Sequence, residues 1–225
     1  MLLLSADTSG QHGSIALAQC QPDGGCEILE VLPLAGGTFS AQLVPQIAAL
    51  LAKYHFSKAN LDGFAVASGP GSFTGLRVGL AAVKALAEVL RKPIAAVSLL
   101  EAISVAANVQ GRLFSALDAG RNEVYLGEYD ISGPNAQLVS ERLLSRDAAA
   151  EEVRGLMVAT TERPTAELLA RHALEVRHIT TPASELVARI GWNKILAGST
   201  VSSFDLDANY IRRSDAEIFS KPLSS

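Results

Sequence analysis

The sequence predicts an α/β fold made of two related halves, each with a mixed sheet and flanking helices. Short apolar runs alternate with longer helical patterns along the chain, which is typical of such folds. In addition, a strand that ends in an acidic turn and is followed by another strand occurs near Asp7 and again near Asp118. The two turns are 111 residues apart, about half of the 225-residue chain, so the pattern indicates an internal duplication.

The first half, residues 1–105, is organised around the stretch 63–92, which is typical of a strand, a glycine-rich turn and a helix. Gly69-Pro70-Gly71 ends the strand, because proline cannot donate to a sheet and glycine accepts unusual backbone angles. Ser72 or Thr74 is expected to cap the helix that follows. The other elements expected in this half are strands at 2–6, 14–18, 26–34 and 93–97, and helices at about 41–54, 75–91 and 98–108.

The second half, residues 106–225, restarts the pattern. It predicts strands at 113–117, 123–129 and 155–160 and helices at 165–172 and 183–190. Two units of strand, acidic turn and strand, each followed by further strands and helices, favour a duplicated fold of the ribonuclease-H or actin type.

The composition excludes several classes of protein. With 48% hydrophobic and 19% charged residues, the chain is typical of a globular protein. Its net charge of −4 and pI of about 5.6 argue against direct nucleic-acid binding. No run approaches the ~20 apolar residues of a membrane span, and Leu2-Leu3-Leu4 is too short for a signal peptide. We therefore expect a cytoplasmic protein without membrane contact.

Two cysteines flank a probable hairpin turn. Cys20 and Cys26 lie on either side of Gln21-Pro22-Asp23-Gly24-Gly25, so they are expected to face each other across two strands. Two cysteines cannot complete a zinc site, and the cytoplasm keeps thiols reduced. We expect them to be unpaired structural thiols.

The two acidic turns are the best candidates for phosphate or metal binding. Asp7, Thr8, Ser9 and Asp118 would face each other across a cleft in such a fold, where turn N–H groups hold phosphates and an aspartate holds hydrated Mg²⁺. The alternative is that each aspartate only closes its own turn. The four histidines show no ligand spacing, so no metal site is expected. Gly69–Gly75 lacks the Lys-Ser or Lys-Thr pair of a phosphate-binding P-loop.

The helices at about 41–54 and 75–91 carry more apolar surface than one sheet needs. Their polar stripes are thin, whereas a helix that covers one sheet needs an apolar stripe of only ~100° or somewhat more. Something else must therefore cover them. The residues that we expect on this surface are Leu43, Ile47, Leu50, Gly75, Leu76, Gly79, Ala82, Val83 and Leu86. The alternative is that the helices bury each other and pack against the second half.

Several segments together resemble the TsaB family. They are Leu4-Ser5-Ala6-Asp7-Thr8-Ser9, the run from Gly69 to Gly79, Asp118-Ala119 with Glu123-Val124-Tyr125, and Tyr210-Ile211-Arg212-Arg213. The resemblance covers nearly the whole chain, and the Gly69–Gly79 run is its most specific part. It implies an actin/Hsp70-like fold.

The resemblance also implies a function. TsaB is the non-catalytic partner in bacterial synthesis of threonylcarbamoyladenosine at tRNA adenosine 37. It pairs, through helices of its first half, with the catalytic subunit TsaD, which the ATPase TsaE joins. TsaC supplies the threonylcarbamoyl-adenylate. The apolar helices above would thus form the interface with TsaD, and tRNA would be met only through the complex. A homodimer of the isolated chain, and ATP or ADP with Mg²⁺ at the interface, stay open.

One segment separates this chain from its catalytic relatives. TsaD-like proteins carry two metal-binding histidines four residues apart, in an Asn-His-x-Glu-Gly-His-like segment. The corresponding residues here are Ser98-Leu99-Leu100-Glu101-Ala102-Ile103, so the histidine positions hold Leu99 and Ile103. Neither side chain can bind iron or zinc. The resemblance therefore implies a subunit without transferase activity of its own.

Two enzymatic alternatives remain at the level of the sequence. The first is a small-molecule kinase or ATPase of the actin-like class, with Asp7 and Asp118 around Mg-ATP. The second is a metal-dependent glycoprotease, an activity once assigned to the wider family. Nucleotide binding and metal content would distinguish these alternatives from a scaffold.

Overall fold

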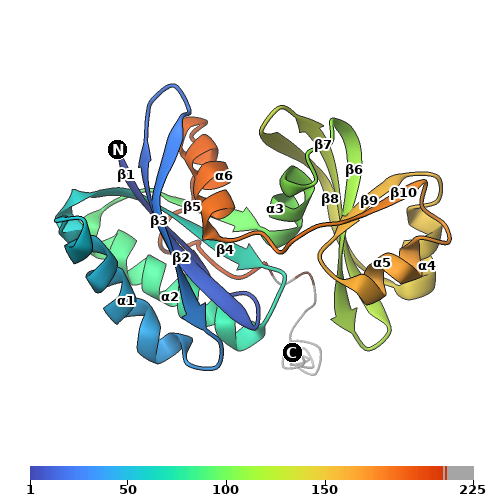
Figure 1. Ribbon diagram of the computed structural model, residues 1–225, viewed down its shortest axis with the longest axis horizontal. Coiled ribbons are helices and arrows are strands. Elements are labelled where there is room, and N and C mark those ends of the chain that lie inside the picture. The colour runs from blue at the N-terminus through green and yellow to red at the C-terminus, as the bar shows by residue number, and fades with distance from the viewer. Residues whose placement is uncertain (210, 212–225) are drawn as a thin grey trace, which may run out of the picture.

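The computed structural model, which describes residues 1–209 and 211, contains two five-stranded mixed sheets (Figure 1). The first has the order β3-β2-β1-β4-β5 and the second β10-β9-β6-β7-β8. In each sheet an antiparallel hairpin is followed by parallel strands, so the two halves share one plan and the predicted duplication is confirmed. The strands are β1 (Leu2–Asp7), β2 (His12–Cys20), β3 (Cys26–Ala35), β4 (Leu61–Gly69), β5 (Ile94–Ser98), β6 (Gly111–Gly120), β7 (Glu123–Ser132), β8 (Asn135–Ser145), β9 (Met157–Thr160) and β10 (Glu175–His178).

The first sheet is covered on both faces, which is why its central strands are apolar throughout. Helices α1 (Phe39–Lys53) and α2 (Phe73–Leu90) pack on one face, where Leu4, Phe64 and Val83 belong to one core cluster. Helix α6 (Ser184–Leu196) packs on the other face, where Leu3 and Trp192 belong to a second cluster. Figure 1 shows the sheet between these helices.

The predicted end of the strand and the Ser72 cap are confirmed at the glycine-rich turn, but the helix begins at Phe73, two residues earlier than predicted. Gly69 ends β4 at a positive φ and a cis peptide bond to Pro70. Ser72 then caps α2 and accepts a hydrogen bond from the Gly75 N–H. Ser98 likewise caps α3 (Leu99–Ala106), which leads to the second half. The remaining helices are the single turn η1 (Lys58–Asn60), α4 (Arg146–Glu152) and α5 (Arg163–Leu169).

The expected division of the chain at residue 105 needs a correction. Helix α6 packs on β1, β2, β4 and β5 of the first sheet, although it follows the second half in the sequence. Gly191 permits this packing, because a Cβ at that position would overlap with the Ala65 side chain. The segment after α6 also returns to the first half, where Val201 forms a bridge with Ile94 and Leu206 joins the core. The second half is therefore an insertion from α3 to β10.

Cys20 and Cys26 face each other across β2 and β3 as expected, but the expectation of unpaired thiols is wrong. The two residues are direct partners in the antiparallel register, and a disulfide joins them. Cross-strand neighbours bring their side chains close together, which permits the bond. Helix α6 is hydrogen-bonded to this end of the hairpin. Trp192 Nε1 donates to the Gln21 carbonyl, and Arg189 Nη1 donates to the Cys26 carbonyl.

None of the helices in the described part of the chain has the length and apolar character to cross a membrane.

Candidate functional site

The first acidic turn is a packed structural element. Asp7 ends β1 and is almost completely buried. Its carboxylate accepts hydrogen bonds from the Ser9 backbone N–H, at 2.8 Å, and from the Ser9 hydroxyl, at 2.6 Å. Burial raises the pKa of the Asp7 carboxyl, while the Ser9 hydrogen bonds lower it. These contacts are those of an aspartate that closes its own turn.

The same turn is fitted against the start of α2. Thr8 Oγ1 donates to the Gly75 carbonyl at 2.7 Å, and the Ser72 N–H donates to the Ser9 carbonyl at 2.7 Å. A Cβ on Gly75 would overlap with the Thr8 carbonyl oxygen, and a Cβ on Gly79 with Thr8 Oγ1. Gly75 and Gly79, which we expected on a surface that a partner covers, thus make room for the turn around Thr8.

The second acidic turn lies in a different environment. Asp118 is exposed, and its carboxylate is 3.4 Å from Arg146 Nη2. Its backbone N–H donates to Glu162 at 2.6 Å. The described contacts of Asp7 and Asp118 therefore involve separate sets of neighbours. Within the described residues, no group of three or more His, Cys, Asp or Glu side chains is placed to hold a metal ion.

Most of the residues that we expected on an exposed helix surface lie in the core of the first half. Val83 is 0% exposed, and the burial follows from the inward-facing positions of α1 and α2, which pack on the sheet. The expectation that these residues are accessible to a partner is wrong for the buried members of the set, which are Leu43, Ile47, Leu50, Gly75, Leu76, Gly79 and Val83. Ala82 and Leu86 are only partly exposed.

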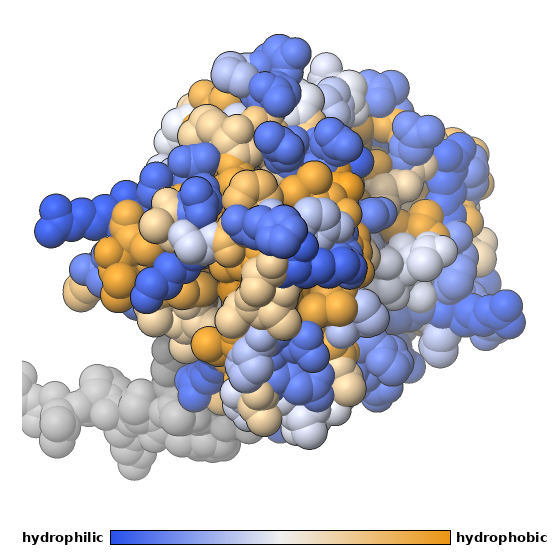
Figure 2. Space-filling model, turned by 60° about the vertical axis from the view of Figure 1, so that its left-hand side comes forward, coloured by the Kyte–Doolittle hydropathy of each residue, from blue (hydrophilic) through white to orange (hydrophobic). Residues whose placement is uncertain are grey.

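The accessible apolar surface of these two helices includes one predicted residue, Ala82, and is otherwise formed by side chains outside the predicted set. Val44 on α1 is 57% exposed and Phe73 at the start of α2 is 44% exposed. Together with Val78, Ala81 and Ala82 they line a groove of about 610 Å³ between the two helices. We call these five residues the α1–α2 surface. Figure 2 brings this side of the first half forward and shows hydrophobic atoms gathered between hydrophilic ones.

Sequence reasoning missed Val44 and Phe73. Val44 directly follows Leu43, which is buried, and the sequence does not say which of two adjacent apolar residues faces the sheet. Phe73 was placed in a turn, but it is the first residue of α2, and its ring lies 3.8 Å from the Arg77 guanidinium carbon. A cation over an aromatic face is typical of a partly solvated position.

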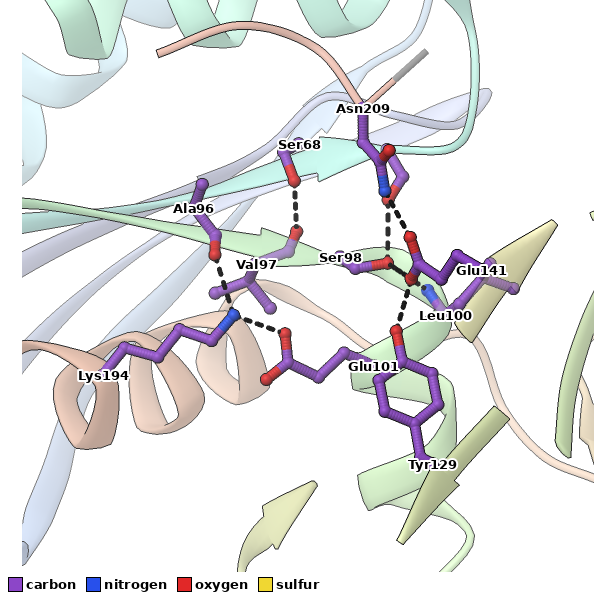
Figure 3. Close-up of polar contacts among 11 residues, drawn as sticks. Ser68, Ala96, Val97, Ser98, Leu100, Glu101, Tyr129, Glu141, Lys194 and Asn209 are labelled. Carbon is purple, nitrogen blue, oxygen red and sulfur yellow. Dashed lines mark hydrogen bonds and ion pairs between the residues drawn. The ribbon is translucent and has the colours of Figure 1, made fainter. Parts of the chain in front are cut away.

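The segment 98–103, where the resemblance led us to expect the counterparts of metal-binding histidines, is packed in an apolar core. Leu99 and Ile103 belong to the core cluster between α3 and the second sheet, with Leu113 and Tyr129. On another side of the same helix, Glu101 pairs with Lys194 of α6 at 2.6 Å (Figure 3). The helix therefore joins the two halves through packing and an ion pair.

Comparison with known proteins places this arrangement in a family. A family model described as "TsaD: tRNA N6-adenosine threonylcarbamoyltransferase" matches residues 33–186, well over half of the chain. The chain belongs to the TsaD family. Its fold is accordingly of the actin-like, ribonuclease-H-like type.

Curated relatives of this TsaD-family chain include several TsaB proteins. It is 37% identical to the Bacillus subtilis tRNA threonylcarbamoyladenosine biosynthesis protein TsaB over 134 residues, 57% of this chain and 55% of that protein. The match to TsaB of Haemophilus influenzae covers 53% of that protein, so the chain spans about half the length of these two relatives. TsaB of Escherichia coli is 27% identical over 96% of both chains.

Solved structures agree with the sequence relatives. The TsaD-family chain is 25% identical to YeaZ from Pseudomonas aeruginosa, with a TM-score of 0.75 over 93% of this chain and 99% of that one. A second P. aeruginosa structure, described as similar to peptidase YEAZ, gives a TM-score of 0.78 at the same identity, over 94% and 99% of the two chains. The predicted resemblance to TsaB is therefore confirmed, although Tyr210, Arg212 and Arg213 lie outside the described residues.

Proposed function

We propose that this chain is a non-catalytic scaffold and activating subunit in the synthesis of tRNA threonylcarbamoyladenosine, and that it pairs with a TsaD-type transferase. The observation that carries the proposal is the α1–α2 surface, an exposed apolar groove on the first half of a TsaD-family chain whose sequence relatives are TsaB proteins. An apolar groove at the junction of two helices is the kind of surface that a helical partner covers.

The composition of the α1–α2 surface supports a protein partner. Val44 and Phe73 are large apolar side chains that monomeric proteins seldom leave together at the surface. The small residues Ala81 and Ala82 line the same groove and would allow a partner helix to approach closely. A stable interface buries about 1,600 Å² in total, and two helices of this length from each partner are large enough to supply it.

The non-catalytic assignment rests on α3. Leu99 and Ile103 stand where catalytic relatives are expected to carry metal ligands, and both are packed in an apolar core. Leucine and isoleucine have no donor atom for a metal. The chemistry of transfer would then belong to the TsaD-type partner. Contact with tRNA, recruitment of a TsaE-type ATPase and a cytoplasmic location are part of the same proposal.

Co-purification of the full chain with the TsaD-type protein of the same cell tests the proposal. Val44→Glu and Ala81→Glu place a carboxylate on the α1–α2 surface at exposed positions, so folding should be retained. Each is expected to weaken association at least tenfold, because the added carboxylate would have to lose its water when a partner covers the apolar groove. Leu174→Glu is the matched control, since Leu174 is exposed in the second half.

Undiminished association of both folded variants would exclude the α1–α2 surface as the interface. Loss of association in the Leu174→Glu control as well would mean that added charge, and not its position, causes the effect. The scaffold role is tested separately, by measuring threonylcarbamoyl transfer to tRNA. The isolated chain should be inactive, and the TsaD-type protein should be more active in its presence.

A further inference from the structure

A second cavity lies where the two halves meet, on the side of the first sheet opposite to α1 and α2. Its volume is about 510 Å³, within the range of small-molecule sites. Its wall is built from the carboxyl ends of the parallel strands β4 and β5, from α3 and α6, and from β7 and β8 of the second half. Ligands of open α/β sheets bind at the carboxyl ends of parallel strands.

Glu141 of β8 is the central polar group of this cavity (Figure 3). Its carboxylate accepts hydrogen bonds from the Ser98 hydroxyl, the Tyr129 hydroxyl and the Asn209 side-chain amide. All three donors are neutral. In the described part of the chain, no Lys, Arg or His side chain lies within ion-pair distance of Glu141, although carboxylates in such half-buried positions are usually paired.

The charged side chains that line the cavity have a net charge of −1 among the described residues. Glu101 and Glu141 are acidic, and Lys194 is the one described cation that lines the cavity. Lys194 Nζ is 2.6 Å from Glu101 Oε2 and 3.0 Å from the Ala96 carbonyl oxygen, so its charge is already matched by Glu101. Burial raises the pKa of Glu101, and the ammonium of Lys194 opposes this effect. Among the described residues, Glu141 is thus left without a counter-ion.

We propose that this cavity binds a small organic cation with a primary ammonium group, and that Glu141 is its counter-ion. The Lys194 contacts show that the wall accommodates an ammonium group between a carboxylate and a main-chain carbonyl. Leu138 and Ile190 line the same cavity and offer apolar contact to a short carbon chain. A divalent metal fits less well, because the described residues supply no group of three ligands.

The proposal is independent of the role of the α1–α2 surface. Titration calorimetry of the full chain with n-butylamine and with putrescine tests it, and 1-butanol and butyrate serve as neutral and anionic controls of the same length. Both amines are expected to bind saturably. The alcohol and the acid are expected to bind at least tenfold more weakly, because neither supplies the missing positive charge.

Glu141→Gln removes the charge but keeps a side chain of similar shape, and it should weaken amine binding at least tenfold. Glu151→Gln is the matched control, since Glu151 is exposed on α4 and does not line the cavity. Equal binding of butanol and butylamine, amine binding that Glu141→Gln leaves unchanged, or no saturable binding below about 10 mM would each overturn the proposal.

A second variant tests the site if Glu141→Gln does not fold. Leu138 is 57% exposed on the cavity wall, so Leu138→Lys should be tolerated and would bring its own ammonium group to Glu141. Folding is checked by circular dichroism. This variant is expected to abolish amine binding, and unchanged affinity in a folded Leu138→Lys protein would contradict the proposed site.

Discussion

The hydroxyl of Thr8, in the turn between β1 and β2, donates a hydrogen bond to the main-chain oxygen of Gly75 in the first turn of α2. The contact joins the first hairpin to the helix that carries four of the five residues of the α1–α2 surface. It depends on the absence of a side chain at residue 75, because a Cβ there would overlap with the Thr8 carbonyl oxygen.

Gly75→Ala is therefore expected to lower the free energy of unfolding by about 2 kcal/mol or more, as overpacking against backbone does. Urea unfolding measures the effect. Gly10→Ala is the matched control, since the nearest atom to a Cβ at Gly10 would be at an ordinary 3.5 Å. Equal stability of the two variants would show that the hairpin moves away from α2 at little cost.

Two glutamate substitutions on neighbouring positions of α2 should behave differently. Val83→Glu buries a carboxylate in the core and is expected to lower stability by more than about 3 kcal/mol. Ala81→Glu adds the same group on the exposed side of the helix, and its cost should be below about 0.5 kcal/mol. Thermal unfolding of both variants checks this. It also determines which substitution is a fair probe of the interface, because an unfolded variant loses every partner.

Asp7→Asn should change how stability depends on pH. Burial raises the pKa of the Asp7 carboxyl in the folded state, so the folded protein binds this proton more tightly than the unfolded chain does. The stability that this group contributes is present below its unfolded pKa of about 3.9 and is lost as the pH rises through the folded pKa. An asparagine carries no such penalty, and its oxygen still accepts from Ser9.

We therefore expect the Asp7→Asn protein to gain stability relative to the wild type as the pH is raised from acid to neutral. Urea unfolding of both proteins across this range measures the difference. A constant difference at all pH values would mean that Asp7 titrates alike in the folded and unfolded states.

The Cys20–Cys26 disulfide closes only a short hairpin, so its contribution to stability should be modest. Reduction is expected to lower the free energy of unfolding by about 2 kcal/mol, the amount that chain entropy gives for so small a loop. Unfolding with and without reductant measures it, and thiol titration of the denatured chain counts the free cysteines. The Cys20→Ser/Cys26→Ser double variant is the control and should not respond to reductant.

Mg-ATP titration addresses the enzymatic alternative. If the turns at Asp7 and Asp118 form a nucleotide site in the isolated chain, calorimetry should detect binding that Asp118→Ala weakens. Because Asp7 is buried and bonded to Ser9, while Asp118 pairs with Arg146, we expect no tight binding without a partner. Tight binding with turnover would favour a kinase or ATPase.

The local features that the sequence predicted correctly have local causes. Proline and glycine end β4, Ser72 and Ser98 cap α2 and α3, and the strand–turn–strand units recur because each half repeats one plan. Strand β8 was missed because its apolar residues do not alternate. It has a register irregularity opposite Tyr129, and both Leu138 and Val139 are exposed.

The features that the sequence could not supply depend on tertiary contacts. The apolar stripe of α1 was recognised, but whether Leu43 or Val44 is exposed follows from the angle at which the helix meets the sheet. The sheet on which α6 packs could not be predicted for the same reason, because the apolar face of this helix could cover either sheet. The disulfide was missed for a different reason: the sequence predicted that Cys20 and Cys26 face each other, but both thiols were expected to stay reduced in the cytoplasm.

The return of α6 to the first sheet has a consequence for synthesis on the ribosome. When residues 1–105 have emerged, β1–β5 can form, but the face that carries Leu3 and Ala65 still lacks Trp192 and its helix. At ordinary elongation rates the nascent chain waits on the order of ten seconds for that helix. The first half is thus synthesised first, but its core is completed only after the second half has been synthesised.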